Sequence, residues 1–261
     1  AEVDYLLYQQ ELLDFLAKHK PDGITPRLIP DKQGRKLGEI RDEAGRSRKV
    51  RLLSWVEGRL WSGVNPISDR LLYSLGESCG MLSKTLAGFD HPEAHRKFEW
   101  DLAQAEWTTE YLHLFTTDQQ GLVSYFQKPF LNFQKKYKLL RKSVVHNDAN
   151  DNNILVSERP IDPDVLAIID FGDAIYTQLI NDLAIAIAYA VMGKTDVLSA
   201  ALPLVKGYHQ KNPLQEKELE FLYNLVAMRL VISVTKSAMN RKAEPGNSYL
   251  LVSEEAAWDV L

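Results

Sequence analysis

The chain has 261 residues, and 31 Lys and Arg side chains against 35 Asp and Glu give a formal net charge of −4. This balance disfavours nucleic-acid binding, which usually requires a concentrated basic surface. The single cysteine, Cys79, excludes an internal disulfide framework and favours a reducing, cytoplasmic location. No apolar stretch is long enough to span a bilayer, so we expect no membrane partner.

The beginning of the chain predicts a small α/β unit. Leucines at helical spacing indicate a helix over residues 5–18, which Pro21 and Gly23 should end. Short extended runs, separated by turn-rich segments, follow over residues 26–30, 36–42 and 49–56. A linker near residues 55–66 then leads into the rest of the chain.

The remainder of the chain is mainly helical in pattern. Pro129 should kink or break one of the expected helices. Two β-type runs, 154–156 and 165–169, interrupt them, and the turn-rich segment between the runs predicts a β-hairpin. The expected helices cover residues 68–86, 102–115, 120–140, 179–193, 196–210 and 214–239, with a last one from about residue 253.

These elements predict an α+β fold with two lobes. Residues 1–57 would form the small α/β lobe, and residues 58–261 would form a large, mainly helical lobe that contains the β-hairpin. We expect the chemistry of the protein to flank that hairpin.

A motif with chemical meaning surrounds the hairpin. Residues 146–153 read His-Asn-Asp-Ala-Asn-Asp-Asn-Asn, and residues 170–173 read Asp-Phe-Gly-Asp. The order His-x-Asp-x-x-x-x-Asn, hairpin, Asp-Phe-Gly is the catalytic-loop and metal-loop pair of protein-kinase-like phosphotransferases. Each fixed residue alone is a weak signal, but six in register are a strong one. The alternative is a polar loop whose Asn and Asp residues only form turns and caps.

Three residues of the motif are candidates for the chemistry itself. Asp148 is expected to orient the attacking hydroxyl or to act as its general base, and the pattern does not separate these roles. Asn153, the other catalytic residue of this loop, and Asp170 are expected to bind Mg²⁺, because a hard cation prefers oxygen ligands. The hairpin should bring the two ligands together and leave room for phosphate oxygens and water.

Four further residues are assigned to the surroundings of the site. His146 is expected to hold the shape of the loop through backbone hydrogen bonds rather than to act in catalysis. Asp182 is a charge in an apolar helix, so we expect it to hold the catalytic loop through backbone amides or His146. Asp151 and Asp173 are possible contacts of a cationic substrate; alternatively, they form the loop and cap the next segment.

The motif resembles that of the aminoglycoside phosphotransferase and choline kinase superfamily, and the chain is most similar to hydroxylysine kinase-like phosphotransferases. The resemblance implies a protein-kinase-like bilobal fold with ATP between the lobes and Mg²⁺ at the site. It identifies a hinge strand in which the backbone near Trp55 and Val56 would contact the adenine. Weaker similarity extends the resemblance to nearly the whole chain, over residues 98–102, 182–189, 229–235 and 247–250.

The resemblance also implies a reaction. The expected activity is ATP- and Mg²⁺-dependent phosphoryl transfer to a hydroxyl of a small amine or amino acid, such as hydroxylysine, choline, ethanolamine, homoserine or an aminoglycoside. A protein kinase is disfavoured, because the short run from Asp170 to Asp182 leaves no space for an activation loop.

Two family features are missing from the chain, namely the phosphate-covering loop and the strand lysine that binds ATP. The chain also lacks an initiator methionine, so we expect the first part of the small lobe to lie outside this sequence, which would leave the chain inactive by itself. The alternative is a kinase-like binding or regulatory module without catalysis. Some bacterial relatives are fused to a class III pyridoxal-phosphate aminotransferase, so the resemblance allows a fused domain outside this chain.

Overall fold

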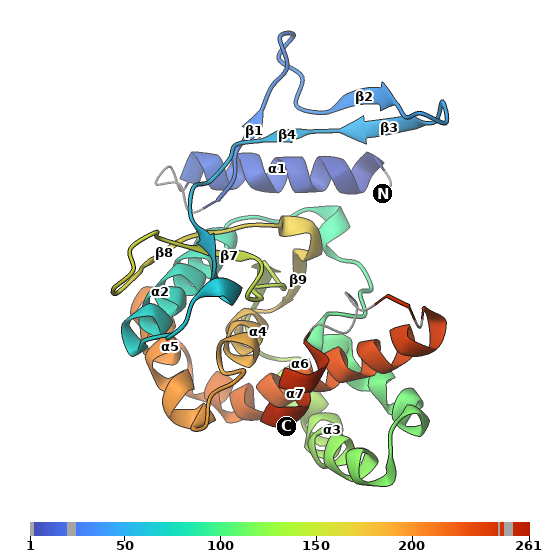
Figure 1. The fold of residues 1–261 in the computed structure, drawn as a ribbon, viewed down its shortest axis with the longest axis vertical. Coiled ribbons are helices and arrows are strands. Elements are labelled where there is room, and N and C mark those ends of the chain that lie inside the picture. The colour runs from blue at the N-terminus through green and yellow to red at the C-terminus, as the bar shows by residue number, and fades with distance from the viewer. Residues whose placement is uncertain (1–2, 20–24, 245, 248–252) are drawn as a thin grey trace.

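A computed structural model describes residues 3–19, 25–244, 246–247 and 253–261 of the chain. The predicted helix end at Pro21 and Gly23 lies outside the described residues, as does most of the stretch 247–250. Figure 1 shows a small upper part made of strands and one helix, above a large part made mainly of helices. No helix in these described ranges is long and apolar enough to cross a membrane.

The small upper part consists of one helix beneath two short antiparallel strand pairs (Figure 1). The helix buries Leu12 and Leu16 on one face, as the leucine spacing predicts. The strands lie at the predicted extended runs, with Leu28 paired to Leu53 in one of the two pairs. The elements are α1 (Val3–His19), β1 (Leu28–Ile29), β2 (Gly38–Arg41), β3 (Ser47–Val50) and β4 (Leu52–Leu53).

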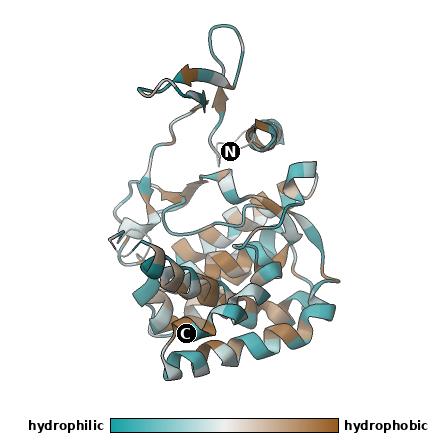
Figure 2. Cartoon of the chain, turned by 90° about the vertical axis from the view of Figure 1, so that its right-hand side faces the viewer, coloured by the Kyte–Doolittle hydropathy of each residue, from teal (hydrophilic) through white to brown (hydrophobic). Residues whose placement is uncertain are grey.

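The large part contains the helices that the apolar periodicity predicts, with ends shifted by a few residues. Helix α4 lies at its centre, and every residue of this helix except Tyr189 is buried. Figure 2 shows hydrophobic segments gathered on the helices around it. The elements are α2 (Asp69–Leu86), η3 (Leu102–Leu114), α3 (Thr117–Tyr137), α4 (Ile180–Ala190), α5 (Val197–Lys211), α6 (Glu216–Ala243) and α7 (Glu254–Val260).

Two helical predictions differ from the structure. Pro129 lies inside α3 without ending it, because Phe126 and Phe130 on either side are buried and hold the helix against the lobe. Of the two outcomes predicted at Pro129, a kink or a break, the break is therefore wrong. The segment predicted as a helix from Leu102 is a 3₁₀ helix, with three residues per turn.

Helices α2 and α5 lie side by side at very short distance (Figure 1). A Cβ atom added at Gly76 of α2 would come within 2.0 Å of the carbonyl oxygen of Leu204. One added at Gly207 of α5 would come within 2.1 Å of the carbonyl oxygen of Tyr73. This close packing of the two helices therefore requires glycine at both positions.

Two small sheets carry the polar loops of the motif. The predicted hairpin is present as β7 (Ile154–Val156) and β8 (Val165–Ile168), and it is extended by β5 (Arg59–Leu60), which lies within the expected linker. A second sheet pairs β6 (Lys142–Val145) with β9 (Ile175–Gln178). The sequence patterns did not predict β5, β6 or β9.

Candidate active site

The two polar loops lie side by side because of how the strands pair. Strand β6 leads into the loop of residues 146–153 and β7 leaves it, whereas β8 and β9 flank the loop of residues 169–174. Strand β6 pairs with β9, and β7 pairs with β8, both antiparallel. The backbone of Ile169 also donates a hydrogen bond of 2.9 Å to the carbonyl of Asn153. Both loops therefore emerge at one edge.

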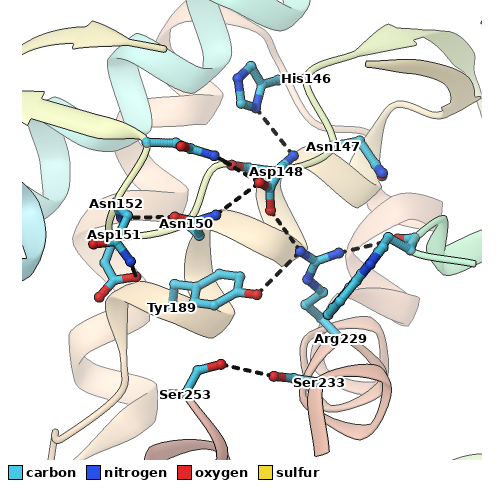
Figure 3. Close-up of polar contacts among 12 residues, drawn as sticks. His146, Asn147, Asp148, Asn150, Asp151, Asn152, Tyr189, Arg229, Ser233 and Ser253 are labelled. Atoms are coloured by element: carbon cyan, nitrogen blue, oxygen red, sulfur yellow. Dashed lines mark hydrogen bonds and ion pairs between the residues drawn. The ribbon is translucent and has the colours of Figure 1, made fainter. Parts of the chain in front are cut away.

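The carboxylate of Asp148 lies at the centre of several hydrogen-bond donors (Figure 3). Its Oδ2 accepts hydrogen bonds from the side-chain amides of Asn150 and Asn153, at 2.9 and 2.8 Å. Its Oδ1 accepts one from Nη2 of Arg229, at 2.9 Å. The Asp148 side chain remains 20% exposed, so an incoming group can reach the carboxylate.

Asn153 and Asp170 are suited to bind a hard cation. Nδ2 of Asn153 donates to the backbone and carboxylate oxygens of Asp148, at 3.0 and 2.8 Å, which leaves its Oδ1 available as a ligand. Oδ1 of Asp170 accepts from the backbone of Gly172 at 3.0 Å, which leaves Oδ2. The described residues contain no cluster of three or more His, Cys, Asp or Glu that could hold a metal. A cation bound here would complete its shell with phosphate oxygens and water.

The loop that contains Asp170 is held in place from the small lobe and from Arg96. Asp170 itself has a φ of 59°, in the left-handed region that side chains rarely adopt. The Tyr5 hydroxyl of α1 donates to the carbonyl of Gly172. Arg96 donates to the carbonyl of Ala174 at 2.7 Å and to the Tyr5 hydroxyl at 2.9 Å. The sequence patterns did not indicate Tyr5 or Arg96.

His146 lies beneath the loop and is fully buried. Its Nε2 donates to the carbonyl of Ile169 at 2.9 Å, and its Nδ1 accepts from the backbone of Asp148 at 3.2 Å. These bonds fit the tautomer with the proton on Nε2. Its ring also meets the edge of the Phe171 ring, with centroids 4.7 Å apart. His146 thus has the contacts expected of a supporting residue.

Asp182 on α4 holds the catalytic loop through the backbone of Asn147. Its Oδ1 accepts from the amide of Asn147 at 2.9 Å, and its Oδ2 accepts from the hydroxyl of Ser83 at 3.2 Å. Burial raises the pKa of Asp182 above its ordinary value. Asn147 has a φ of 65°, a conformation that this hydrogen bond helps to maintain. The predicted contact with backbone amides is present.

Asp151 and Asp173 have carboxyl groups near Asp148. Burial raises the pKa of Asp151. Burial also raises the pKa of Asp173 to about 6, and the nearby charge of Asp148 adds to the increase. Carboxyl groups with raised pKa values beside a candidate catalytic residue are typical of functional sites.

Trp55 and Val56 do not lie at Asp148; they line a separate cavity of about 540 Å³ between the lobes. The cavity reaches from these two residues to Asp170 and Phe171, and Arg51 also lines it. The side chain of Trp55 is 82% exposed. One end of the cavity is therefore apolar and near the predicted hinge, and the other is at a candidate metal ligand.

The sequence reasoning missed three residues around Asp148, namely Arg229, Tyr189 and Trp100. Arg229 donates to the Tyr189 hydroxyl at 3.3 Å and to the Trp100 carbonyl at 3.2 Å. Its guanidinium carbon lies 4.6 Å from the Trp100 ring centre and 5.4 Å from that of Tyr189. A signal was present, since Arg229 interrupts an apolar run of α6 just as Asp182 interrupts α4.

Two solved structures that share this fold are named as kinases. An amicoumacin kinase in complex with AMP-PNP, Ca²⁺ and Ami superposes with a TM-score of 0.70 at 16% identity, covering 99% of this chain and 78% of that one. A microcompartment-associated aminopropanol kinase superposes with a TM-score of 0.65 at 17% identity, covering 98% and 80%. The predicted α+β, protein-kinase-like bilobal fold is thereby confirmed.

The sequence of the chain matches a family of phosphate-transferring enzymes. Residues 2–219 match the phosphotransferase enzyme family, and the chain belongs to it. Hydroxylysine kinase of Danio rerio is 28% identical over 212 residues, which cover 78% of this chain and 59% of the relative. Hydroxylysine kinase of Mus musculus is 27% identical over 228 residues, which cover 82% and 60%. The chain spans about three-fifths of the length of these relatives.

Proposed function

We propose that this chain carries the catalytic and metal loops of an ATP- and Mg²⁺-dependent phosphotransferase that acts on a hydroxyl of a small amine or amino acid. The observation that carries the proposal is the placement of Asp148. Its reachable carboxylate accepts a hydrogen bond from the side-chain amide of Asn153, and the backbone of Asn153 is bonded to Ile169, the residue before Asp170. A hydroxyl acceptor and a metal-bound phosphate thus have adjacent places.

Each part of the site has a separate task in this reaction. Asp148 orients the acceptor hydroxyl and takes its proton, and Asn153 and Asp170 hold Mg²⁺. The cation, when bound, neutralises the charge of the transferred phosphoryl group. Trp55 and Val56 contact the adenine, and the cavity that they line together with Asp170 has a volume of about 540 Å³, which is in the range of small-molecule sites.

The acceptor is a cationic small molecule in this proposal. Asp151 and Asp173 offer carboxylates beside Asp148, and carboxylates pair well with an ammonium group. The names of the relatives, hydroxylysine kinase and aminopropanol kinase, support an amine that carries a hydroxyl. They give no support to the fused aminotransferase that the resemblance allows. A cytoplasmic location fits the one cysteine, which is free and buried.

The test is ATP turnover by the full-length protein with hydroxylysine, choline, ethanolamine, homoserine and kanamycin as acceptors. We expect turnover with at least one amine and a loss of about 1,000-fold or more in Asp148→Asn. Binding of MgATP is measured in parallel through the fluorescence of Trp55, with Trp55→Phe as the control. Nucleotide binding without turnover of any acceptor would contradict the proposal and favour the non-catalytic module.

A further inference from the structure

Arg229 is a charged side chain that the proposed reaction does not use directly. It lies on α6, is 1% exposed and is the largest of the fully buried side chains. Burying a guanidinium is costly unless the charge is paired and its hydrogen bonds are satisfied. The carboxylate of Asp148 is the acid to which it is paired among the described residues. A buried charge of this kind therefore faces the candidate catalytic group.

The exposure of the two partners is unequal. The side chain of Arg229 is 2% exposed, whereas that of Asp148 is 20% exposed. A substrate can thus reach the carboxylate but not the guanidinium. Arg229 therefore cannot bind a substrate carboxylate directly. Any effect of Arg229 on the reaction has to act through Asp148.

The two oxygens of Asp148 are occupied to different extents. Oδ2 accepts two amide hydrogen bonds, from Asn150 and Asn153, and this uses both acceptor positions of that oxygen. Among the residues that the structure describes, Oδ1 accepts only the bond from Arg229. One acceptor position remains on Oδ1, next to the guanidinium. An acceptor hydroxyl would therefore bind to the oxygen that Arg229 holds.

Arg229 itself is held from several sides (Figure 3). Nη1 donates to the carbonyl of Trp100, and Nη2 is shared between Asp148 and the hydroxyl of Tyr189. The faces of the Trp100 and Tyr189 rings enclose the cation. The guanidinium has few alternative positions, so it fixes the plane of the carboxylate in turn.

We propose that Arg229 is a positioning residue for the phosphoryl transfer, which holds Oδ1 of Asp148 in the orientation that accepts the substrate hydroxyl while remaining inaccessible to the substrate. This inference rests on the proposed function. Misplacement of a reacting group by about 1 Å can cost about 100-fold in rate. The role thus predicts a loss in kcat that is out of proportion to any loss in stability or nucleotide affinity.

The experiment compares Arg229→Met and Arg229→Lys with the wild type in the full-length protein. We expect Arg229→Met to lower kcat about 100-fold and to leave the KM for ATP within about twofold, because Arg229 does not line the nucleotide cavity. Arg229→Lys keeps the charge but not the planar fork, so it should lose about tenfold. A kcat of Arg229→Lys between those of Arg229→Met and the wild type is the partial rescue that an orientation effect predicts.

The matched control is Arg141→Met. Arg141 forms a similar ion pair with the buried carboxylate of Glu218, away from the site, with N···O distances of 2.7 and 2.8 Å. Its loss should lower the melting temperature without changing kcat in the remaining folded protein. If Arg229→Met does not fold, the kcat of Arg229→Lys alone tests the inference, and its melting temperature is measured in parallel.

Two results would overturn the inference. The first is a kcat within about threefold of the wild type in the folded Arg229 variants. The second is a loss of kcat that is matched by an equal loss of MgATP affinity, or that Arg141→Met of the same stability shows to the same extent. A wild type that binds MgATP but turns over no acceptor would contradict the proposed function and this inference with it. An active wild type with equally active variants would contradict only the role of Arg229.

Discussion

Arg51 lines the cavity that we propose for the nucleotide, and part of its hydrogen-bonding capacity is unused. It follows β3, lines the cavity together with Asp170, and its Nη1 is buried without a hydrogen-bond partner among the described residues. A buried donor without a partner costs free energy, and an anionic ligand would remove that cost. Phosphate oxygens that approach a cation at Asp170 would supply one.

Replacing Arg51 is therefore expected to weaken nucleotide binding through the phosphates. We expect Arg51→Gln to raise the Kd for MgATP about tenfold, equal to about 1.4 kcal/mol, and to leave the Kd for adenosine unchanged. Calorimetric titration measures both. Arg48→Gln on β3, which removes an exposed ion pair with Asp42, serves as the control. Equal losses for MgATP and adenosine would contradict a phosphate contact.

The charge of Asp173 lowers the stability of the folded protein, although the proposed function uses this carboxylate to bind the substrate. Its pKa is about 6 in the folded protein, above the ordinary value of 3.8. Above pH 6 the folded protein carries this charge at a cost, and below about pH 4 the group is protonated in both the folded and unfolded states, so that the cost disappears. Asp173→Asn should thus stabilise the protein above pH 6, and this gain should vanish as the pH falls toward 4.

The expected gain is about 1–2 kcal/mol at pH 7.5, after allowance for partial exposure. Chemical denaturation in the presence of a chelator, from pH 4 to 8, measures it. Asp31→Asn is the control, since hydrogen bonds from Arg35 lower the pKa of Asp31 and its loss should not stabilise. A gain for Asp173→Asn that is independent of pH would refute the assignment to a buried charge.

The residues of the site were predictable to the extent that they lie in a local motif. Asp148, Asn153 and Asp170 are defined by short spacings, and the structure joins Asn153 to Asp148 by a hydrogen bond and to Ile169, the residue before Asp170, by another. Arg229 lies 81 residues from Asp148, and no local pattern joins them. Only the cost of a charge in an apolar helix marks such a residue, and that signal names no partner.

At the scale of elements, the strands that were missed all pair with partners that are distant in the sequence. The β7–β8 hairpin has its pairing partners about ten residues apart, so its two apolar runs and the turn-rich segment between them are sufficient to predict it. Strands β6 and β9 are four residues long and pair across an interval of about 30 residues. Burial against the helical lobe stabilises such short strands more than their own propensity does.

The packing of α2 on α5 gives a prediction at the same scale. Gly76→Ala and Gly207→Ala place a methyl group against backbone atoms that cannot move independently of their helices. We expect each to lower the free energy of unfolding by about 2–3 kcal/mol.

The control for these changes is Gly121→Ala in α3, where an added Cβ meets nothing within 4 Å. Alanine is the better helix former, so this variant should gain about 0.5–1 kcal/mol. Urea denaturation of the three variants provides the comparison. A Gly76 or Gly207 variant as stable as the wild type would show that the helices can separate without cost.

At the scale of the whole molecule, the cavity between the lobes couples them through any ligand that fills it. Its lining comes from the small lobe at Leu13, Arg51 and Trp55 and from the large lobe at Leu155 and Asp170. A ligand that binds only the folded protein stabilises it by about 2.7 kcal/mol at 100 times its Kd. Nucleotide binding should therefore raise the melting temperature of both lobes together.

The contribution of Mg²⁺ to this effect depends on Asp170. In the wild type, MgATP should raise the melting temperature more than ATP with a chelator does. In Asp170→Asn the two increments should be equal, because a neutral amide is a weaker ligand for a hard cation. Differential scanning fluorimetry measures all four conditions. A persistent Mg²⁺ increment in Asp170→Asn would argue against Asp170 as a ligand.

The close packing of α2 on α5 at Gly76 and Gly207 also bears on how the chain is made. These two residues are separated by more than half of the chain, and each helix leaves part of its face uncovered until the other arrives. During synthesis, α2 emerges from the ribosome long before α5 has been translated. The packing of α5 on α2 can therefore form only after more than 200 residues have been made, and until then the face of α2 that contains Gly76 stays uncovered.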